Sequence, residues 1–120
     1  MKPQLPKLVE DYVRATNNHD AVSFIALFAA DAVVDDIGRE FRGLDAINAW
    51  SDREIFDVQV TLDVIGCTSR DGETVVTAKA DGTFDRTGLP DPLILAHHVV
   101  IKDDKIVRLR CRLAGEDAST

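Results

Sequence analysis

The sequence lacks the features that would direct a protein to a membrane or to a nucleic acid. No stretch approaches the roughly 20 consecutive apolar residues that span a bilayer, so we expect no membrane contact. The 14 basic side chains are outnumbered by 21 acidic ones, which gives a formal net charge of −7. Nucleic-acid binding needs a basic surface that neutralises phosphates, so we do not expect a nucleic-acid partner. The sequence also has no glycine-rich phosphate loop and no Gly-x-Ser-x-Gly turn.

Cysteine is scarce as well. Cys67 and Cys111 are the only two, and neither forms a Cys-x-x-Cys pair or has a histidine at ligand spacing. A cysteine-built metal site is therefore not expected. The N-terminal residues have no apolar run of the kind that a secretory signal needs. We expect a cytoplasmic protein with reduced thiols.

What the chain does have is ordinary globular composition. Its 120 residues are 45% hydrophobic and 29% charged, which is typical of a folded chain rather than a disordered one. This length is enough for one domain with a core of its own. No repeat, linker or low-complexity segment interrupts it, so we expect a single domain over 1–120 with its core at about 5–113.

Two periodicities divide the chain. Apolar residues recur at helical spacing from Leu5 to Thr16, whereas after Phe56 apolar and polar residues alternate, as in a half-buried strand. The predicted order is a helix from Pro3 or Pro6 to about Thr16, a helix over 21–29, strands over 32–34 and 40–42, a helix over 44–55, and strands over 58–64, 74–84, 93–102 and 105–113. Helices gathered on one face of a curved antiparallel sheet make an α+β domain, which is the fold class that we expect.

Two adjacent histidines lie on one of these predicted strands. Neighbouring side chains of a strand point to opposite faces, so His97 and His98 cannot share a metal ion. His97 falls on the same face as Leu95 and Val99, which belong to the more apolar set. We therefore predict that His97 faces the interior.

A sequence motif spans residues 27–47. The run Leu-Phe-Ala-Ala-Asp-Ala-Val-Val-Asp-Asp over 27–36 is followed by Gly-Arg-Glu-Phe-Arg-Gly-Leu-Asp-Ala-Ile over 38–47. It resembles the nuclear transport factor 2-like superfamily and, within it, the SnoaL-like and ketosteroid isomerase-like branch. The similarity in element order and spacing extends from Leu5 to Leu113. It implies a cone-shaped, cystatin-like α+β barrel, in which a curved sheet wraps around three N-terminal helices and encloses a deep, mostly apolar pocket.

The same resemblance carries three functional residues to this sequence. Asp36 closes the motif where ketosteroid isomerases keep the carboxylate that takes a proton from a carbon next to a carbonyl. Tyr12 matches the tyrosine whose hydroxyl hydrogen-bonds the developing oxyanion. His97 lies on the strand where the isomerases place a second donor, a carboxylic acid kept neutral by an apolar site. A histidine at that position departs from the isomerase pattern.

These three side chains make a coherent chemical set. A general base must lie near the substrate, and the enolate that it forms needs donors such as a tyrosine hydroxyl or a neutral imidazole. We predict that Asp36 is the general base and that Tyr12 and His97 orient the substrate oxygen. Structural roles stay open: a turn carboxylate, a core tyrosine and a buried histidine. The candidates for the pocket lining are Phe28, Trp50, Leu95 and Val99.

Functions from different classes fit this picture. The resemblance implies a cofactor-free isomerase, cyclase or dehydratase that acts on a small apolar carbonyl compound. The alternative is a non-catalytic ligand-binding or dimeric scaffold protein of the same fold. An epoxide hydrolase of the limonene type ranks last, because it needs an inward arginine, and Arg39 and Arg42 belong to the short hairpin.

A stripe of basic residues marks the last strand. Arg108, Arg110 and Arg112 alternate with apolar residues, so their side chains share one face. Pairing with acidic side chains on nearby strands, for instance Asp57, Asp63 or Glu73, is the interpretation that we prefer. The resemblance also implies a homodimer through the outer face of the sheet, to which this stripe could belong.

Overall fold

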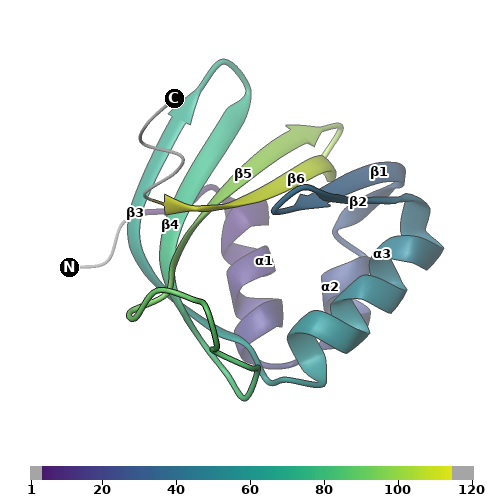
Figure 1. The fold of residues 1–120 in the computed structure, drawn as a ribbon. Helices are drawn as coiled ribbons and strands as arrows, with labels where there is room; N and C mark the ends of the chain where they lie inside the picture. The colour runs from purple at the N-terminus through teal and green to yellow at the C-terminus, as the bar shows by residue number, and fades with distance from the viewer. Residues whose placement is uncertain (1–3, 115–120) are drawn as a thin grey trace.

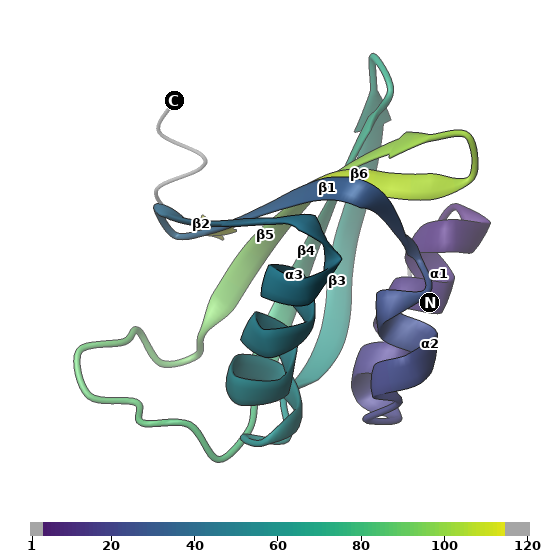
Figure 2. The same ribbon diagram turned by 90° about the vertical axis from the view of Figure 1, so that its right-hand side faces the viewer.

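Helices form one layer of the structure, and a strongly curved sheet forms the other (Figure 1). The computed structural model describes residues 4–114. Its helices are α1 (Lys7–Asn17), α2 (Ala21–Ile25) and α3 (Gly43–Ser51), and α3 continues into a π-helical turn, η1 (Asp52–Phe56). Figure 2 shows that the helices lie within the curve, on one side of the sheet. This arrangement confirms the predicted α+β cone.

The sheet has six strands in the order β2-β1-β6-β5-β4-β3. They are β1 (Phe28–Asp36), β2 (Arg39–Arg42), β3 (Thr61–Arg70), β4 (Glu73–Asp81), β5 (Ile94–Lys102) and β6 (Lys105–Leu113). Each neighbouring pair is antiparallel except β1 and β6, which are parallel. The sheet is therefore mixed, and not antiparallel throughout as predicted. It also does not close into the barrel that the resemblance implies, because β2 and β3 remain at its edges.

Tertiary pairing moves several boundaries in the first half of the chain. Helix α1 begins at Lys7, directly after its N-cap Pro6, while Pro3 lies outside the described residues. Helix α2 ends at Ile25 instead of near residue 29, because the chain extends from Phe28 onward and pairs with β6. As a result β1 covers the whole of 28–36 rather than 32–34 alone.

The start of β3 also differs from the prediction. The strand begins at Thr61 rather than at Val58, because the chain is still turning out of η1. Gln59 has a φ of 54°, and the amide of Val60 donates to the carbonyl of Ile55 at 2.8 Å. The alternation of apolar residues that begins at Val58 thus extends beyond the strand itself.

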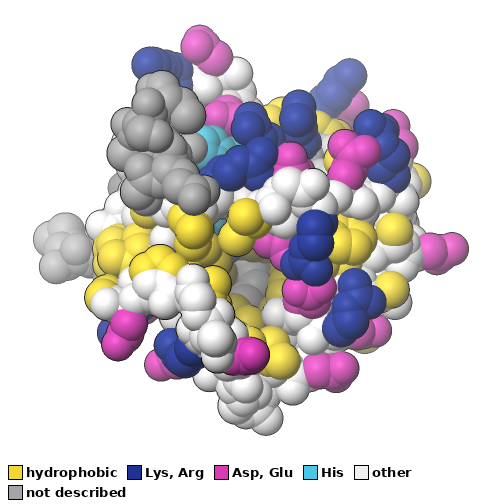
Figure 3. Space-filling view, viewed as in Figure 1, with side chains coloured by type: hydrophobic (Ala, Val, Ile, Leu, Met, Phe, Trp, Pro, Cys, Tyr) yellow, Lys and Arg dark blue, Asp and Glu magenta, His cyan; other side chains and the backbone are white. Residues whose placement is uncertain are grey.

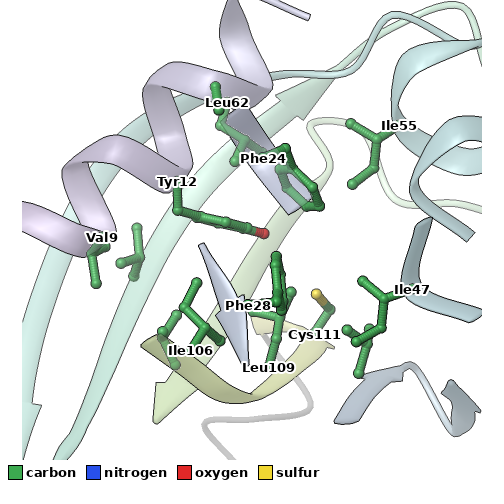
Figure 4. Close-up of a cluster of buried hydrophobic side chains, with 14 of the residues drawn as sticks. Val9, Tyr12, Phe24, Phe28, Ile47, Ile55, Leu62, Ile106, Leu109 and Cys111 are labelled. Carbon is green, nitrogen blue, oxygen red and sulfur yellow. The ribbon is translucent and has the colours of Figure 1, made fainter. Parts of the chain in front are cut away.

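The core fills the space between the two layers (Figure 4). Val9 and Tyr12 project into it from α1, and Phe24 projects from α2. The ring of Phe24 lies 5.6 Å from that of Tyr12 and 5.2 Å from that of Phe28. Burial of each such side chain stabilises the folded state by about 1.5–3 kcal/mol. The predicted apolar stripe of α1 is therefore what attaches this helix to the sheet.

The outer face of the sheet carries the basic stripe. Arg112 forms a cross-strand ion pair, as this kind of stripe predicts, but its partner is Asp35 on β1, through two contacts of 3.1 Å with the carboxylate, and not one of the acids named from the sequence. Arg108 is exposed, and Arg110 is half-buried. Within residues 4–114, no helix combines the length and the apolar character needed to cross a bilayer.

Candidate functional site

A cavity of about 100 Å³ lies between the inner face of the sheet and the helices. Its lining comes from α1, β1, α3, η1 and strands β3, β5 and β6, together with Val60 before β3: Tyr12, Thr16, Asp36, Trp50, Glu54, Ile55, Val60, Leu62, Leu95, His97 and Cys111. Asp36, Tyr12 and His97 thus line one cavity, with the predicted pocket residues Trp50 and Leu95. Phe28 and Val99, the other two lining candidates, are buried in the core and do not line it.

A second, more open compartment of about 270 Å³ adjoins the first. The two share four lining residues, and we call the boundary that these residues form the neck: Asp36, Glu54, Val60 and Leu95. The outer compartment is further lined by apolar side chains such as Phe84, Leu89 and Leu93. Figure 3 shows the surface hollowed near the middle of one face, with hydrophobic side chains around the hollow.

The two predicted donors, Tyr12 and His97, contact each other. The Tyr12 hydroxyl oxygen lies 3.1 Å from Nδ1 of His97, and Sγ of Cys111 lies 3.7 Å from the same nitrogen. His97 is only 4% exposed and faces the interior, as its place on the strand predicts. Burial lowers the pKa of His97 to about 4, with a smaller contribution from His98, so the ring is neutral at pH 7. Burial also raises the pKa of Tyr12 well above its usual value, which keeps the hydroxyl protonated.

The hydrogen-bond pattern favours one tautomer of His97. Nε2 has no partner among the described residues, and the Tyr12 hydroxyl contacts only Nδ1. If the hydroxyl donates to Nδ1, the single unpaired group is an N–H at Nε2. The other tautomer leaves both Nε2 and the hydroxyl hydrogen unpaired, at about 1–3 kcal/mol for each buried group. His97 therefore carries an unpaired N–H at Nε2, buried next to the cavity that its ring lines.

The carboxylate of Asp36 is oriented by two donors. Its Oδ2 accepts from the indole Nε1 of Trp50 at 3.1 Å and from the guanidinium of Arg39 at 2.6 Å. Its Oδ1 has no hydrogen-bond partner within residues 4–114. The turn role that the sequence left open for Asp36 belongs to Asp35, whose Oδ1 accepts from the amide of Gly38 at 2.9 Å. Asp36 is thus held in place with one oxygen available.

Arg39 links two carboxylates at the neck. Besides Asp36, it donates to both oxygens of Glu54 at 2.7 and 2.8 Å. These bonds lower the pKa of Glu54 and raise that of Arg39. Arg39 belongs to the hairpin, as predicted, but its side chain lines the outer compartment, so the expectation that no arginine points inward is wrong. The ring of Phe41 on this hairpin lies 5.9 Å from that of Trp50 on α3, and η1, which follows α3, brings Glu54 within reach of Arg39.

Sequence reasoning missed several residues of the cavity. Cys111 could have been found, because it shares a strand face with Leu109 and pairs with His97 across β5 and β6. Thr16 could also have been found, because it lies one turn after Tyr12 on the buried face of α1. Glu54 carries no such signal, since its position depends on how η1 packs against the sheet. Within the described part of the chain, no three His, Cys, Asp or Glu side chains cluster closely enough to hold a metal ion.

A family model described as the SnoaL-like domain matches residues 9–109. The chain belongs to the SnoaL-like family. A candidate polyketide cyclase from Sinorhizobium meliloti is 30% identical to this SnoaL-like protein. Its structure matches with a TM-score of 0.80, over 90% of this chain and 95% of that chain.

Two further solved structures share the fold of this SnoaL-like protein at lower identity. A Catenulispora acidiphila protein with a ketosteroid isomerase-like fold, in complex with trimethylamine, is 20% identical. The match has a TM-score of 0.76 and covers 91% of this chain and 86% of that one. A Mycobacterium tuberculosis protein in complex with estradiol-17β-hemisuccinate is 18% identical, with a TM-score of 0.75 and coverage of 91% and 92%. A comparison with curated protein sequences gives no match.

Proposed function

We propose that this SnoaL-like protein binds a small apolar carbonyl compound and moves a proton on the carbon next to the carbonyl. One observation carries the proposal. A carboxylate with a free oxygen, Asp36, and a buried N–H donor, His97, line the same mostly apolar cavity. Pockets of this kind orient one small molecule with a few polar groups. The reaction would be an isomerisation, cyclisation or dehydration that needs no cofactor.

The chemistry follows from these two groups. Oδ1 of Asp36 takes a proton from the carbon, and the electrons of the broken C–H bond move to the carbonyl oxygen, forming an enolate. The Nε2–H of His97 stabilises the negative oxygen, which contributes about 10²–10³ in rate for a well-placed donor. Asp36 then returns the proton, either to the same carbon or to another carbon of the enolate. In a cyclisation, the enolate carbon attacks a second carbonyl of the same molecule.

The relatives support this class of reaction. The Sinorhizobium meliloti protein is described as a candidate polyketide cyclase, and forming a ring from a polyketide needs carbanion chemistry next to a carbonyl. The ligand of the Mycobacterium tuberculosis protein is an oxygen-bearing apolar ring system. A carbonyl compound with an apolar body is therefore the ligand class that we assign to this chain.

Hydrogen–deuterium exchange tests the proposal without knowledge of the natural substrate. Cyclohexanone and 2-decalone are incubated with the protein in D₂O, and the loss of protons next to the carbonyl is followed by NMR. Asp36→Asn should slow the catalysed exchange by about 100-fold or more, because general-base catalysis contributes 10²–10⁴. The matched control is Asp35→Asn, whose carboxylate pairs with Arg112 outside the cavity and whose loss should leave the rate unchanged. Equal rates for the wild type and Asp36→Asn would refute the role of Asp36.

The second candidate is a protein that binds such a compound without turnover. The Asp36 side chain is held by Trp50 and Arg39, and the same bonds would stabilise an inert binding pocket. This function predicts that ketones bind to the wild type and to Asp36→Asn with the same affinity. It also predicts no exchange above the rate in buffer.

One observation also raises the epoxide hydrolase hypothesis. Arg39 lies between two carboxylates, Asp36 and Glu54, which is the acid–arginine–acid arrangement that the sequence did not indicate. Hydrolysis of cyclohexene oxide in H₂¹⁸O, abolished by Glu54→Gln, would favour it. Against it, the Tyr12 hydroxyl that would help to hold the attacking water is bonded to His97.

We propose a homodimer through the outer face of the sheet. Nε of Arg110 is buried on this face and has no hydrogen-bond partner among residues 4–114. The half-buried apolar residues Val75 and Val100 share the face with it. Light scattering after gel filtration should give twice the monomer mass. Arg110→Glu should weaken the dimer more than Arg108→Glu, because Arg108 is already exposed.

A further inference from the structure

The inner compartment is too small for most of a ligand. An engineered cavity of about 150 Å³ holds benzene, so each carbon needs about 25 Å³. At that ratio, the inner volume of about 100 Å³ takes only about four non-hydrogen atoms. Only the end of a molecule, and not a complete ring system, fits there.

The chemistry of the inner compartment selects a hydrogen-bond acceptor for that end. The Thr16 hydroxyl already donates to the carbonyl of Tyr12 at 2.9 Å, and the Tyr12 hydroxyl is bonded to His97. Burial raises the pKa of Cys111, which therefore stays a neutral thiol. The Nε2–H of His97 is thus the strong donor that remains unpaired, and a carbonyl oxygen is the group that it fits.

The neck has little freedom to widen. On one side Glu54 is held by two bonds to Arg39, and Asp36 is held by Trp50 and Arg39. On the other side, the amide of Val60 is bonded to the carbonyl of Ile55. The reacting carbon of a ligand would lie here, beside Asp36.

The outer compartment is larger and apolar. Its volume of about 270 Å³ takes about eleven non-hydrogen atoms by the same ratio. At its rim Ile37 is 47% exposed and Leu89 is 36% exposed, although both are large hydrophobic residues. A ligand that fills this compartment would cover both side chains with its apolar body.

Charge at the opening favours a neutral ligand. Three carboxylates, those of Asp36, Glu54 and Asp85, line the outer compartment, against the single guanidinium of Arg39. An anionic ligand would meet a net negative surface, and its entry would be opposed.

From these dimensions we infer that the cavity is a size filter: it selects neutral monocyclic and bicyclic ketones with the oxygen at one end and excludes tetracyclic ones. This inference rests on the ligand class of the proposed function. In all, the two compartments take about 15 non-hydrogen atoms, which a bicyclic ketone fits and a steroid exceeds. A steroid is rejected because its body has more rings than the outer compartment holds, whereas the body of a bicyclic ketone fits there.

Binding of three ketones to the wild-type protein tests the filter. The probes are cyclohexanone, 2-decalone and androst-4-ene-3,17-dione, and the readout is the fluorescence of Trp50, the single tryptophan, which lines the inner compartment. We expect 2-decalone to bind at least tenfold more tightly than cyclohexanone, because it also fills the outer compartment. The tetracyclic ketone should bind at least tenfold more weakly than 2-decalone. Equal or tighter binding of the tetracyclic ketone would overturn the inference.

The two cysteines supply a matched pair of variants. Cys111→Leu fills the inner compartment and should reduce 2-decalone binding at least tenfold, whereas Cys67→Leu, outside both compartments, should bind it as the wild type does. If Cys111→Leu does not fold, Ala80→Leu narrows the outer compartment instead. That change should weaken 2-decalone binding and leave cyclohexanone binding unaltered. Unchanged 2-decalone binding in the folded variant would contradict the filter.

The outcomes separate this inference from the proposed function. Exchange that is insensitive to Asp36→Asn would refute the catalytic role and leave the size selection intact, since selection is measured by binding alone. Tight binding of the tetracyclic ketone would refute the filter and leave the role of Asp36 standing.

Discussion

Replacement of His97 should remove a specific part of the acid sensitivity of the protein. In the unfolded chain the imidazole takes up a proton near its ordinary pKa of 6.5, whereas in the folded protein burial lowers the pKa to about 4. Between these values the unfolded state binds more protons, so the free energy of unfolding decreases as the pH falls from 6.5 toward 4. The full effect is about 3 kcal/mol, and about 2 kcal/mol of it lies between pH 7 and pH 4.5.

Urea unfolding at pH 7 and pH 4.5, followed by the fluorescence of Trp50, measures this loss. With a slope of about 1–3 kcal/mol per molar urea, the wild-type midpoint should fall by about 1–2 M. His97→Gln lacks the titrating ring, so its midpoint should fall much less, whatever its stability at pH 7. His98→Gln, altered at the neighbouring residue on the opposite face, is the control and should keep most of the wild-type response, because burial is the larger cause of the lowered pKa of His97.

The same pH difference in His97→Gln and in the wild type would refute the reasoning. Carboxyl groups do not imitate the effect. The pKa values of Asp35 and Glu54 are lowered in the folded protein. The stability that these two carboxylates contribute is therefore lost mainly below pH 4.5, where the carboxyl groups of the unfolded chain become protonated. Their contribution is also present in both proteins and cancels in the comparison.

Two stability predictions concern single contacts in the fold. Gly82→Ala places a Cβ 2.7 Å from the backbone carbonyl oxygen of Val58, which cannot move away, so it should lower the melting temperature by several degrees. The Cβ of Gly88→Ala meets no atom within 4 Å, so this variant should lower the melting temperature less, although both glycines have positive φ. Asn17→Ala removes two hydrogen bonds to the backbone of Leu62, at 3.0 and 2.7 Å, and should cost about 1–2 kcal/mol in urea unfolding. An Asn17→Ala midpoint within error of the wild type would show that these bonds do not anchor α1 to β3.

Local patterns in the sequence determine most of the elements. The apolar spacing in α1 predicts which of its side chains are buried, because residues three and four apart lie on one face of a helix. Strand alternation does the same for β5, where it correctly turns His97 inward. The motif over 27–47 identifies the family, and with it the order of the elements and the α+β cone. All of these signals lie within short segments of the sequence. The helical and strand patterns arise because one side of each element faces the core and the other faces water.

The remaining features depend on contacts between segments that are distant in the chain. The parallel pairing of β1 with β6 lengthens β1 at the expense of α2, and no local periodicity encodes that competition. The bond between Tyr12 and His97 and the ion pairs of Arg39 arise only when α1, the β1–β2 hairpin and η1 pack on the sheet. The volumes of the two compartments likewise depend on how side chains from many elements pack around them. The sequence thus determines the elements and the family, through the burial of one face of each element, and the tertiary structure alone decides which polar groups meet and how large a ligand the cavity holds.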